Sequence, residues 1–535
     1  MRKLFFVIIL LVPALLSRAQ TDPFQVYLQP LTIEGLPGIQ SFAYGQYNGL
    51  WVIIGGRTDG LHQRQPFASF LPEGCNTEIT VVDPVNAKVW RSSLTSLSVP
   101  LQDQLSSTNM EFHQEGDYLY LVGGYGYSKT IDSKLTYALL TAVDLRGVIY
   151  AVQQKSNLAP FFRQVTDQQF AVTGGYLHRL GNTYYLVGGQ KFDGNYNPMN
   201  HPTFNQSYTN AIRKFMLEDD GINLKITHLP AIIDTAAFHK RDYNVVPQHF
   251  PNGKAGMTAF SGVFQINADI PMLHAVNIDD DSYEIVREFA QYYNHYHCAN
   301  LPLYAASTGA MHTVFFGGIA QYYEHDGILT QDSDVPFVTT IARVTRDRNG
   351  QMAEYNLPLE MPQLLGASAA FIPAHGIPMF ENGVIKLDEL STDSVMVGYI
   401  YGGMKSSAAN IFWVNDGTQS VAQNVLYKVY IKRHPNTTTH LLNPQSINGT
   451  QLQIYPNPAE MTFTFVYHLD KPKKVMLKVT TEQGKSLVME DISSQLVIGN
   501  NRFTKEIKSF KIGGTYLATV TTDGVDAVQR VIVKE

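Results

Sequence analysis

The chain has 535 residues, of which 44% are hydrophobic and 16% are charged, and its formal net charge is −6. This length and composition indicate a globular protein with room for more than one domain. The absence of any block of Lys and Arg argues against a nucleic-acid partner, because phosphate binding needs a clustered positive surface.

Residues 1–19 are predicted to be a secretory signal peptide. Arg2 and Lys3 carry positive charge, residues 4–16 are apolar, and residues 17–19 (SRA) end at a suitable cleavage point before Gln20. The apolar segment is too short to span a bilayer, and no later segment is long and apolar enough to do so. We therefore expect an exported protein that is soluble or anchored at the cell surface, with no transmembrane segment.

A short apolar strand that ends in a glycine pair recurs along the chain. The clearest copy is YLYLVGG at 118–124, and comparable runs end in Gly56, Gly189, Gly318 and Gly403. Successive copies lie 68, 65, 129 and 85 residues apart, so we expect one degenerate copy inside the longest interval, at 258–264. Tandem glycines permit positive φ and close approach of neighbouring chain. Six copies at a period above ~50 residues predict a β-propeller with six blades.

Each repeat continues with a strand, a tight turn and a further strand. Turn residues such as Asp219-Asp220-Gly221 and Asn349-Gly350 suit β-hairpins. In the second repeat, the same pattern predicts a strand over 141–144, a turn at Arg146-Gly147 and a strand over 148–152.

A hydrophobic strand ending in Gly-Gly, followed by a second strand and a hairpin, resembles the kelch repeat over residues 24–434. The resemblance implies an all-β fold in which residues 20–434 form a six-bladed kelch-like propeller. The last repeat is incomplete, because a Pro-, Thr- and Asn-rich linker follows its third strand at 424–432. The strand at 24–33 has no partner nearby, so we expect it to complete the last blade and close the ring, which removes two open sheet edges.

Residues 451–535 follow a linker at 435–450 and alternate like the strands of a small β-sandwich. The phrases YPNPA at 455–459, GGTYL at 513–517 and VIVKE at 531–535 resemble the C-terminal sorting domain of the type IX secretion system of Bacteroidetes. The resemblance implies the type IX machinery as a partner. It also implies removal of this domain and a mature protein that is released or held at the outer-membrane surface.

Long loops follow the glycine pairs, whereas the hairpin turns at the opposite ends of the strands are short. These loops and the blade-to-blade connections follow strands of the same direction, so we expect them on one rim, where function commonly lies. Aromatic faces beside fixed polar groups suit a glycan or peptide ligand, although the same aromatic residues can simply pack the loops together. The binding candidates are Arg57, Tyr125, Lys191, Asp193, Tyr196, Arg241, Asp242, Tyr322, Tyr323, His325 and Lys405.

The segment with His295, His297 and Cys298 leaves three alternatives open. Two His and one Cys within four residues are ligand types for zinc or copper. Cys298 can instead form a disulfide with Cys75, which is expected on the same rim, or the segment is an ordinary packed loop. No resident cofactor is predicted.

The sequence favours an extracellular binding protein that recognises a glycan or a surface protein through the rim. The alternative is a carbohydrate-active enzyme, since some secreted kelch propellers isomerise or epimerise sialic acids with charged residues at the channel mouth. Arg241 and Asp242, together with Glu324, are then the acid–base candidates, and a purely structural Arg–Asp pair is the competing interpretation. A copper oxidase is a further alternative, although its ligands cannot be matched to this chain position by position.

Overall fold

The computed structural model describes residues 22–198, 203–325 and 328–433, and seven segments of the C-terminal part: 452–455, 462–469, 474–481, 485–496, 499–506, 515–522 and 525–532. The chain forms two compact units, which we describe separately: one comprises Phe24–His325 with Leu329–Pro435, and the other contains Asn436–Glu535. The predicted signal peptide (1–19) and the linker (435–450) lie outside the described residues, so the boundaries proposed for them stay predictions.

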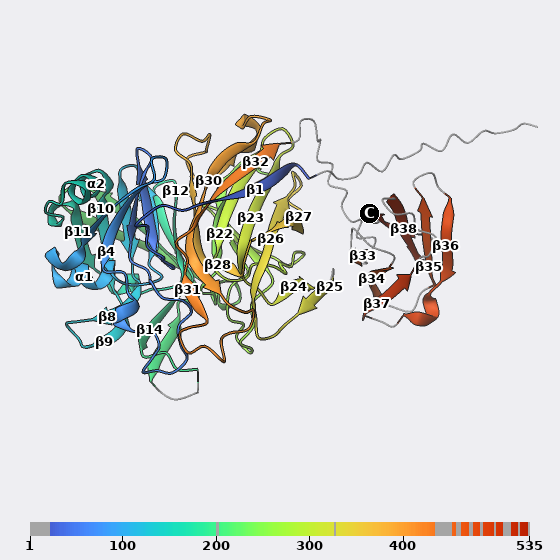
Figure 1. The fold of residues 1–535 in the computed structure, drawn as a ribbon, viewed down its shortest axis with the longest axis horizontal. Coiled ribbons are helices and arrows are strands. Elements are labelled where there is room, and N and C mark those ends of the chain that lie inside the picture. Colours follow the sequence, from blue (N-terminus) through green and yellow to red (C-terminus); the bar gives the residue numbers. More distant parts are fainter. Residues whose placement is uncertain are drawn as a thin grey trace, which may run out of the picture. The chain divides into compact units, whose positions relative to one another are not determined.

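The larger unit is a β-propeller whose six blades are antiparallel sheets with a four-stranded core (Figure 1). Blade 1 contains β2 (Ala43–Tyr47), β3 (Leu50–Ile54), β4 (Glu78–Asp83) and β5 (Lys88–Ser93). Blade 2 contains β6 (Glu111–Glu115), β7 (Tyr118–Val122), β10 (Leu139–Asp144) and β11 (Phe162–Thr166). Blade 3 contains β12 (Tyr176–Leu180), β13 (Thr183–Val187), β16 (Ala211–Asp219) and β17 (Leu224–Ile233). Blade 4 contains β18 (Asn244–His249), β19 (Ala255–Phe260), β20 (Ala275–Ile278) and β21 (Tyr283–Val286). Blade 5 contains β22 (Ala299–Ala305), β23 (Ala310–Ile319), β26 (Phe337–Arg346) and β27 (Met352–Glu360), and the short strand β29 (Ile385–Lys386) pairs with β22.

Blade 6 is closed by the N-terminal strand, which confirms the expectation from the sequence. Its strands are β28 (Leu365–Pro373), β30 (Val395–Ser406), β32 (Leu426–Arg433) and β1 (Phe24–Leu31). Strand β1 pairs antiparallel with β32 from Phe24 opposite Arg433 to Leu31 opposite Leu426. Both edges that would otherwise stay open are thereby paired.

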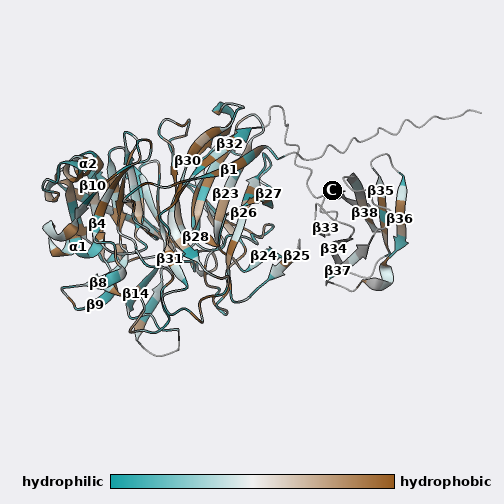
Figure 2. Cartoon of the chain, viewed as in Figure 1, coloured by the Kyte–Doolittle hydropathy of each residue, from teal (hydrophilic) through white to brown (hydrophobic). Residues whose placement is uncertain are grey.

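The core of the propeller is divided among the spaces between blades. Each pair of adjacent blades shares its own cluster of buried apolar side chains. In Figure 2 the blade strands accordingly carry much of the brown, hydrophobic colour. Strands such as β3 and β7 bury almost every residue because both faces of each sheet pack against a neighbouring blade.

The glycine pairs join these neighbouring blades. The second glycine of four pairs donates its N–H to a carbonyl of the adjacent blade over 2.7–2.9 Å: Gly56 to Ser107, Gly124 to Val172, Gly189 to Lys240 and Gly403 to Ile39. In the fourth blade, Ser261 (φ 50°) and Gly262 (φ 104°) adopt the same positive-φ pair of conformations. The degenerate copy expected at 258–264 is therefore confirmed.

The second blade departs from the prediction. Instead of a turn and a strand over 148–152, residues Leu145–Gln154 form helix α2. The Asp144 side chain accepts a hydrogen bond from the Gly147 N–H (3.1 Å) and caps the helix. Leu145, Val148, Ile149 and Val152 recur at helical spacing and are buried, so the packing favours a helix where alternation suggested a strand.

The C-terminal unit is built of two antiparallel sheets, as the sequence predicted. One contains β33 (Leu452–Tyr455), β34 (Thr462–Leu469) and β37 (Gly499–Glu506). The other contains β36 (Ser486–Asp491), β35 (Val475–Thr481), β38 (Thr515–Thr522) and β39 (Val525–Ile532). Within the described residues of both units, no helix is long and apolar enough to cross a membrane.

Candidate functional site

The six blades meet in a closed ring of backbone hydrogen bonds. Each bond runs from the N–H of one blade to the carbonyl of the blade before it, over 2.8–3.3 Å: Asn109 to Ser41, Gly174 to Asn109, Asp242 to Gly174, His297 to Asp242, Ser368 to His297 and Ser41 to Ser368. Five of these residues stand two positions before the first strand of their blade. The ring therefore narrows the propeller channel on the side from which the first strands begin.

Several loops that follow the glycine pairs fold into two-stranded pairs on this same side, which we call the rim (Figure 1, lower side of the propeller). They contain β8 (Tyr125–Ser128) with β9 (Ser133–Thr136), β14 (Gln190–Gly194) with β15 (Phe204–Tyr208), β24 (Tyr322–His325) with β25 (Ile328–Gln331), and β31 (Ser420–Ala422) beside β30. Loops of different blades are tied together. The Ser69 carbonyl of blade 1 accepts from Lys134 Nζ of blade 2 (2.6 Å), and its hydroxyl donates to the Tyr196 carbonyl of blade 3 (3.1 Å).

Two of the predicted binding residues, Arg57 and Tyr125, lie inside this loop layer, and a third, Tyr196, is half-buried in it. Arg57 is 2% exposed, pairs with Asp59 and donates to the Leu71 carbonyl (2.9 Å). Tyr125 is buried and donates to the Gly194 carbonyl (2.6 Å). Tyr196 packs edge-on against His62, with ring centroids 4.5 Å apart. The contacts of these three residues fit the alternative interpretation, in which their side chains pack the rim loops together.

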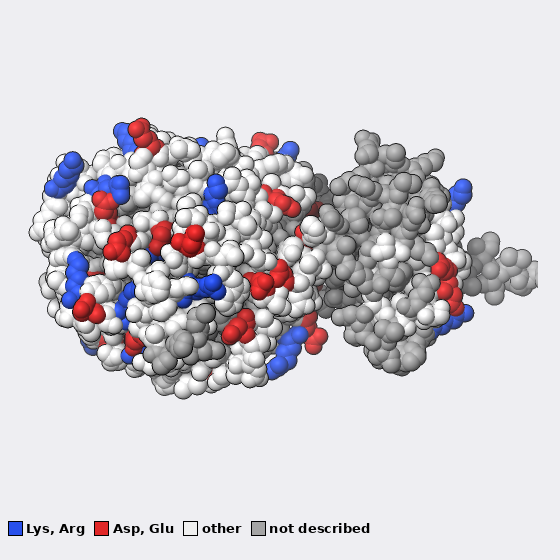
Figure 3. Space-filling model, turned by 60° about the horizontal axis from the view of Figure 1, so that its bottom comes forward, with Lys and Arg blue, Asp and Glu red and all other residues white. Residues whose placement is uncertain are grey.

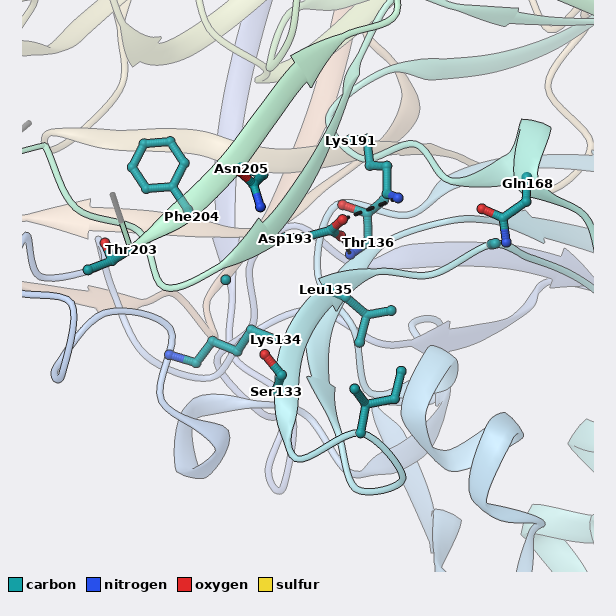
Figure 4. A pocket seen from close by; sticks show the side chains of 13 residues that line it. Ser133, Lys134, Leu135, Thr136, Gln168, Lys191, Asp193, Thr203, Phe204 and Asn205 are labelled. Atoms are coloured by element: carbon teal, nitrogen blue, oxygen red, sulfur yellow. Dashed lines mark hydrogen bonds and ion pairs between the residues drawn. The ribbon is translucent and has the colours of Figure 1, made fainter. Parts of the chain in front are cut away.

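A groove of about 550 Å³ opens on the rim between the β8–β9 and β14–β15 hairpins (Figure 4). The hairpins are held together on one side of it, because the Thr136 hydroxyl donates to the Phe192 carbonyl and accepts from the Phe192 N–H, each over 2.8 Å. The predicted residues Lys191 and Asp193 line the groove and form an ion pair (3.2 Å). The sequence did not single out the other lining residues, among them Ile131, Lys134, Gln168, Thr203, Phe204 and Asn205.

The groove offers donors, acceptors and one aromatic ring, and its charged side chains are Lys134, Lys191 and Asp193. Asp193 also accepts from the Thr136 N–H (3.1 Å), which fixes its carboxylate against β9. Lys134 is 8% exposed and its amine is directed to Ser69, and burial lowers the pKa of this amine. Phe204 stacks on Phe192 with ring centroids 4.7 Å apart, so its position is fixed by packing.

Arg241 and Asp242 meet at the channel mouth, as expected, but they are bound to each other. Arg241 Nη1 donates to Asp242 Oδ2 (2.5 Å), its Nε donates to the Tyr208 hydroxyl (3.0 Å), and its guanidinium lies 5.0 Å from the centroid of the Phe264 ring. The proposed third member, Glu324, instead accepts from the Tyr293 hydroxyl (2.9 Å). The contacts therefore match those of a structural ion pair.

The cavity beside this pair is small, about 40 Å³. Its lining includes a carboxyl that the sequence did not single out, Glu111, which is 2% exposed. Glu111 Oε1 accepts from the Gly175 N–H (2.8 Å), whereas Oε2 has no hydrogen-bond partner among the described groups. Burial is the main cause that raises the pKa of Glu111 to about 8, and the charge of Asp242 adds to it, against the opposing effect of the Gly175 N–H.

The remaining binding candidates do not line the groove. Tyr322 packs edge-on against Tyr292 (5.1 Å between centroids), and Tyr323 and the exposed His325 follow it on β24. Lys405 lies on β30 opposite Leu365 and Val421.

The hypothesis of a metal site at His295, His297 and Cys298 disagrees with the geometry. His295 is fully buried: Nδ1 accepts from the Gln321 N–H (3.0 Å), so Nε2 carries the proton and donates to the Gln291 carbonyl (2.9 Å). Neither nitrogen is left for a metal. Across the described residues, no group of three His, Cys, Asp or Glu side chains is arranged to hold a metal ion. Cys75 and Cys298 are both free thiols, so the disulfide alternative is wrong as well.

Comparison with known proteins identifies the C-terminal part. Residues 453–534 match the family model described as the secretion system C-terminal sorting domain. The match indicates secretion by the type IX system. It places the protein at the cell surface or outside the cell. No curated protein matches the sequence.

Two similar solved structures have low identity. A structure of YjhT shows 11% identity and a TM-score of 0.41 and covers 75% of this chain and 99% of its own. A copper complex of a fungal alcohol oxidase of the AA5 family shows 9% identity and a TM-score of 0.37, and covers 96% of this chain and 100% of its own. The kelch-repeat resemblance stays a prediction, because the family match is confined to the C-terminal unit.

Proposed function

We propose that the protein is an extracellular glycan-binding protein whose ligand lies in the groove between the β8–β9 and β14–β15 hairpins. The observation that carries this proposal is the contrast between this groove and the cavity beside Asp242. The groove, at about 550 Å³, has the size of ordinary ligand sites, whereas the cavity beside Arg241 and Asp242, at about 40 Å³, accommodates only one or a few water molecules.

The chemistry of the groove suits sugars. Asn205, Gln168 and the Lys191–Asp193 pair present planar or paired polar groups that bind hydroxyls in a directional way. The Phe204 ring, held by stacking on Phe192, supplies an apolar contact for the C–H groups of a sugar ring. An enzyme that used Arg241 and Asp242 would first have to break their mutual ion pair and enlarge the cavity beside them, which makes catalysis at this position the weaker interpretation.

The test is binding of the full secreted chain to a printed glycan array, with two groove variants. We expect Asp193→Asn and Lys191→Met to weaken binding about tenfold, the usual effect of losing a directional contact of about 1.4 kcal/mol. Asp193→Asn retains an acceptor for the Thr136 N–H, so the hairpins stay joined. The matched control is Glu218→Gln, which breaks the exposed Lys225–Glu218 pair (2.7 Å) beside the β16–β17 turn of the same blade. Unchanged binding by both groove variants, or no glycan bound by the wild-type chain, would reject the proposal.

A further inference from the structure

Large apolar side chains are exposed on the rim of blades 1 and 6, away from the groove. Phe67 is 80% exposed, Trp413 is 50% exposed and Val414 is 65% exposed. Phe67 belongs to the loop after the first glycine pair, and the other two belong to the loop after the last one. We call these three residues the seam patch, because blade 6 is where the propeller closes.

The seam patch is held in place by contacts between the two loops. The Arg64 guanidinium lies 5.3 Å from the centroid of the Trp413 ring, and the Phe412 ring packs edge-on against Trp413 at 5.1 Å. Asn415 Nδ2 donates to the Leu61 carbonyl over 2.7 Å. Trp413 therefore has a fixed orientation while half of its surface stays open. A fixed, half-open aromatic ring is typical of a binding contact.

One segment of chain connects the seam patch to the groove. Arg64 touches Trp413 at one end of the segment, and Ser69 accepts from Lys134, a groove residue, at the other. Five residues of extended chain span at most about 18 Å, and Phe67 stands between the two contacts. Ile131, which is 63% exposed, adds an apolar side chain to the lining of the groove.

We infer that the groove and the seam patch bind one extended glycan chain of several sugars, with Phe67 and Trp413 as stacking platforms outside the groove. This inference rests on the proposed function and specifies its ligand as a chain of several sugars. The face drawn in Figure 3 carries interspersed Lys, Arg, Asp and Glu without a large area of one sign, which suits a ligand of low charge density. The Arg64 guanidinium lies against Trp413, and Gln65 stands two residues before Phe67, so a polar residue accompanies each exposed ring. Stacked sugars therefore fit this surface better than an apolar helix does.

The test uses an array that carries each glycan repeat as a disaccharide and as a hexasaccharide, probed with the full secreted chain. We expect tighter binding of the hexasaccharide. Trp413→Ala and Phe67→Ala should each lose about tenfold in hexasaccharide affinity, as expected for an aromatic interface contact, with disaccharide binding unchanged. Asp193→Asn should weaken binding at both lengths. The control is Ile222→Ala, which removes an equally exposed apolar side chain (78%) from the β16–β17 turn.

Two outcomes would overturn the extended-chain inference and leave the groove proposal standing. One is equal affinity for the disaccharide and the hexasaccharide, and the other is wild-type affinity for the hexasaccharide in both Trp413→Ala and Phe67→Ala. Absence of binding at both lengths would reject the proposed function itself and the inference with it. A further outcome is that the chain binds peptides on a peptide array but binds no glycan, and that Trp413→Ala abolishes the peptide binding. The ligand would then be a polypeptide, and the inference would be overturned.

Discussion

The Ser41 amide donates to the Ser368 carbonyl over 3.1 Å, and this bond joins the first blade to the last at the propeller channel. The same two blades share a cluster of buried apolar side chains, and β1 completes the outer edge of blade 6. Closure thus depends on contacts at the channel, between the blades and at the outer edge. Because Trp51, Trp90 and Trp413 are the three tryptophans of the chain and all belong to the propeller, tryptophan fluorescence reports its unfolding alone.

The first prediction concerns the closing strand. Phe24 on β1 is 2% exposed and meets His312 edge-on at 5.5 Å, whereas Tyr27 on the opposite face of the same strand is 43% exposed. We expect Phe24→Ala to destabilise the propeller by about 3–5 kcal/mol, the usual effect of emptying a buried phenylalanine site. Tyr27→Ala should change stability by less than about 1 kcal/mol. Urea denaturation followed by tryptophan fluorescence measures both, and equal losses would contradict β1 as a structural part of blade 6.

The second prediction concerns the glycine pairs. Gly123 has φ 64°, and a Cβ there would lie 1.9 Å from the Val172 carbonyl oxygen of the next blade. Gly116 has a similar φ of 55° but nothing within 4 Å of such a Cβ. Gly116→Ala should therefore cost only the positive-φ strain of about 1–2 kcal/mol, while Gly123→Ala should cost about 1–3 kcal/mol more from the clash. Equal unfolding midpoints for the two variants would show that close contact between blades does not require glycine.

The third prediction is a pH dependence caused by Glu111. Its pKa is raised from 4.5 to about 8, chiefly by burial, so between these values the folded protein holds a proton that the unfolded chain releases. The stability contributed by this proton is complete at low pH and is lost as the pH rises toward about 8. Glu111→Gln removes this proton exchange. We expect the stability of the variant relative to the wild type to increase between about pH 5 and about pH 8, by at most about 1.4 kcal/mol per pH unit.

Urea midpoints of both proteins across this range test the effect. Glu354, whose pKa burial also raises to about 8, contributes equally to the two proteins and cancels in the comparison. Glu218→Gln at an exposed position is the control. A constant difference between Glu111→Gln and wild type over the whole range would show that Glu111 is ionised in the folded protein.

The fourth prediction concerns His295. Burial lowers its pKa to about 4, so between this value and its usual 6.5 the unfolded chain binds the proton first. The stability that His295 contributes is thus present above about pH 6.5 and is lost as the pH falls toward about 4. His295→Ala leaves the Gln321 N–H and the Gln291 carbonyl without their partner, which should cost about 1–3 kcal/mol.

The measurement for His295 combines urea denaturation with elemental analysis of the purified chain. We expect the copper and zinc contents of wild type and variant to be the same, and the exposed His375→Ala to leave stability unchanged. One equivalent of copper or zinc per chain that is lost in His295→Ala would restore the metal hypothesis.

The sequence alone determined the repeat, its number and its closure. Where two blades meet, the backbone of one blade packs directly against a carbonyl of the next, and a residue without a side chain fits this contact. The requirement is therefore visible in the sequence as a strand that ends in a glycine pair. Even the Ser261-Gly262 pair could be located, because the interval between its neighbours left room for one more repeat. The strand at 24–33 had no partner, and the last repeat lacked its fourth strand. Because open sheet edges are disfavoured, the sequence predicted that the strand at 24–33 completes the last blade.

The tertiary structure alone decided which side chains meet on the rim. Lys191, Asp193, Lys134 and Phe204 all follow glycine pairs, but only the fold shows that hairpins of two different blades bring them to one groove. Tyr125 could not be recognised as buried, since Gly194 and Phe192 of another repeat contact it. Arg57 is buried because its own long loop folds back over it, with Asp59 and Leu71 as partners. Helix α2 and the roles of Glu111 and His295 were settled by packing as well. A local pattern specifies the conformation of its own segment, whereas contacts between loops depend on how distant segments fold over one another.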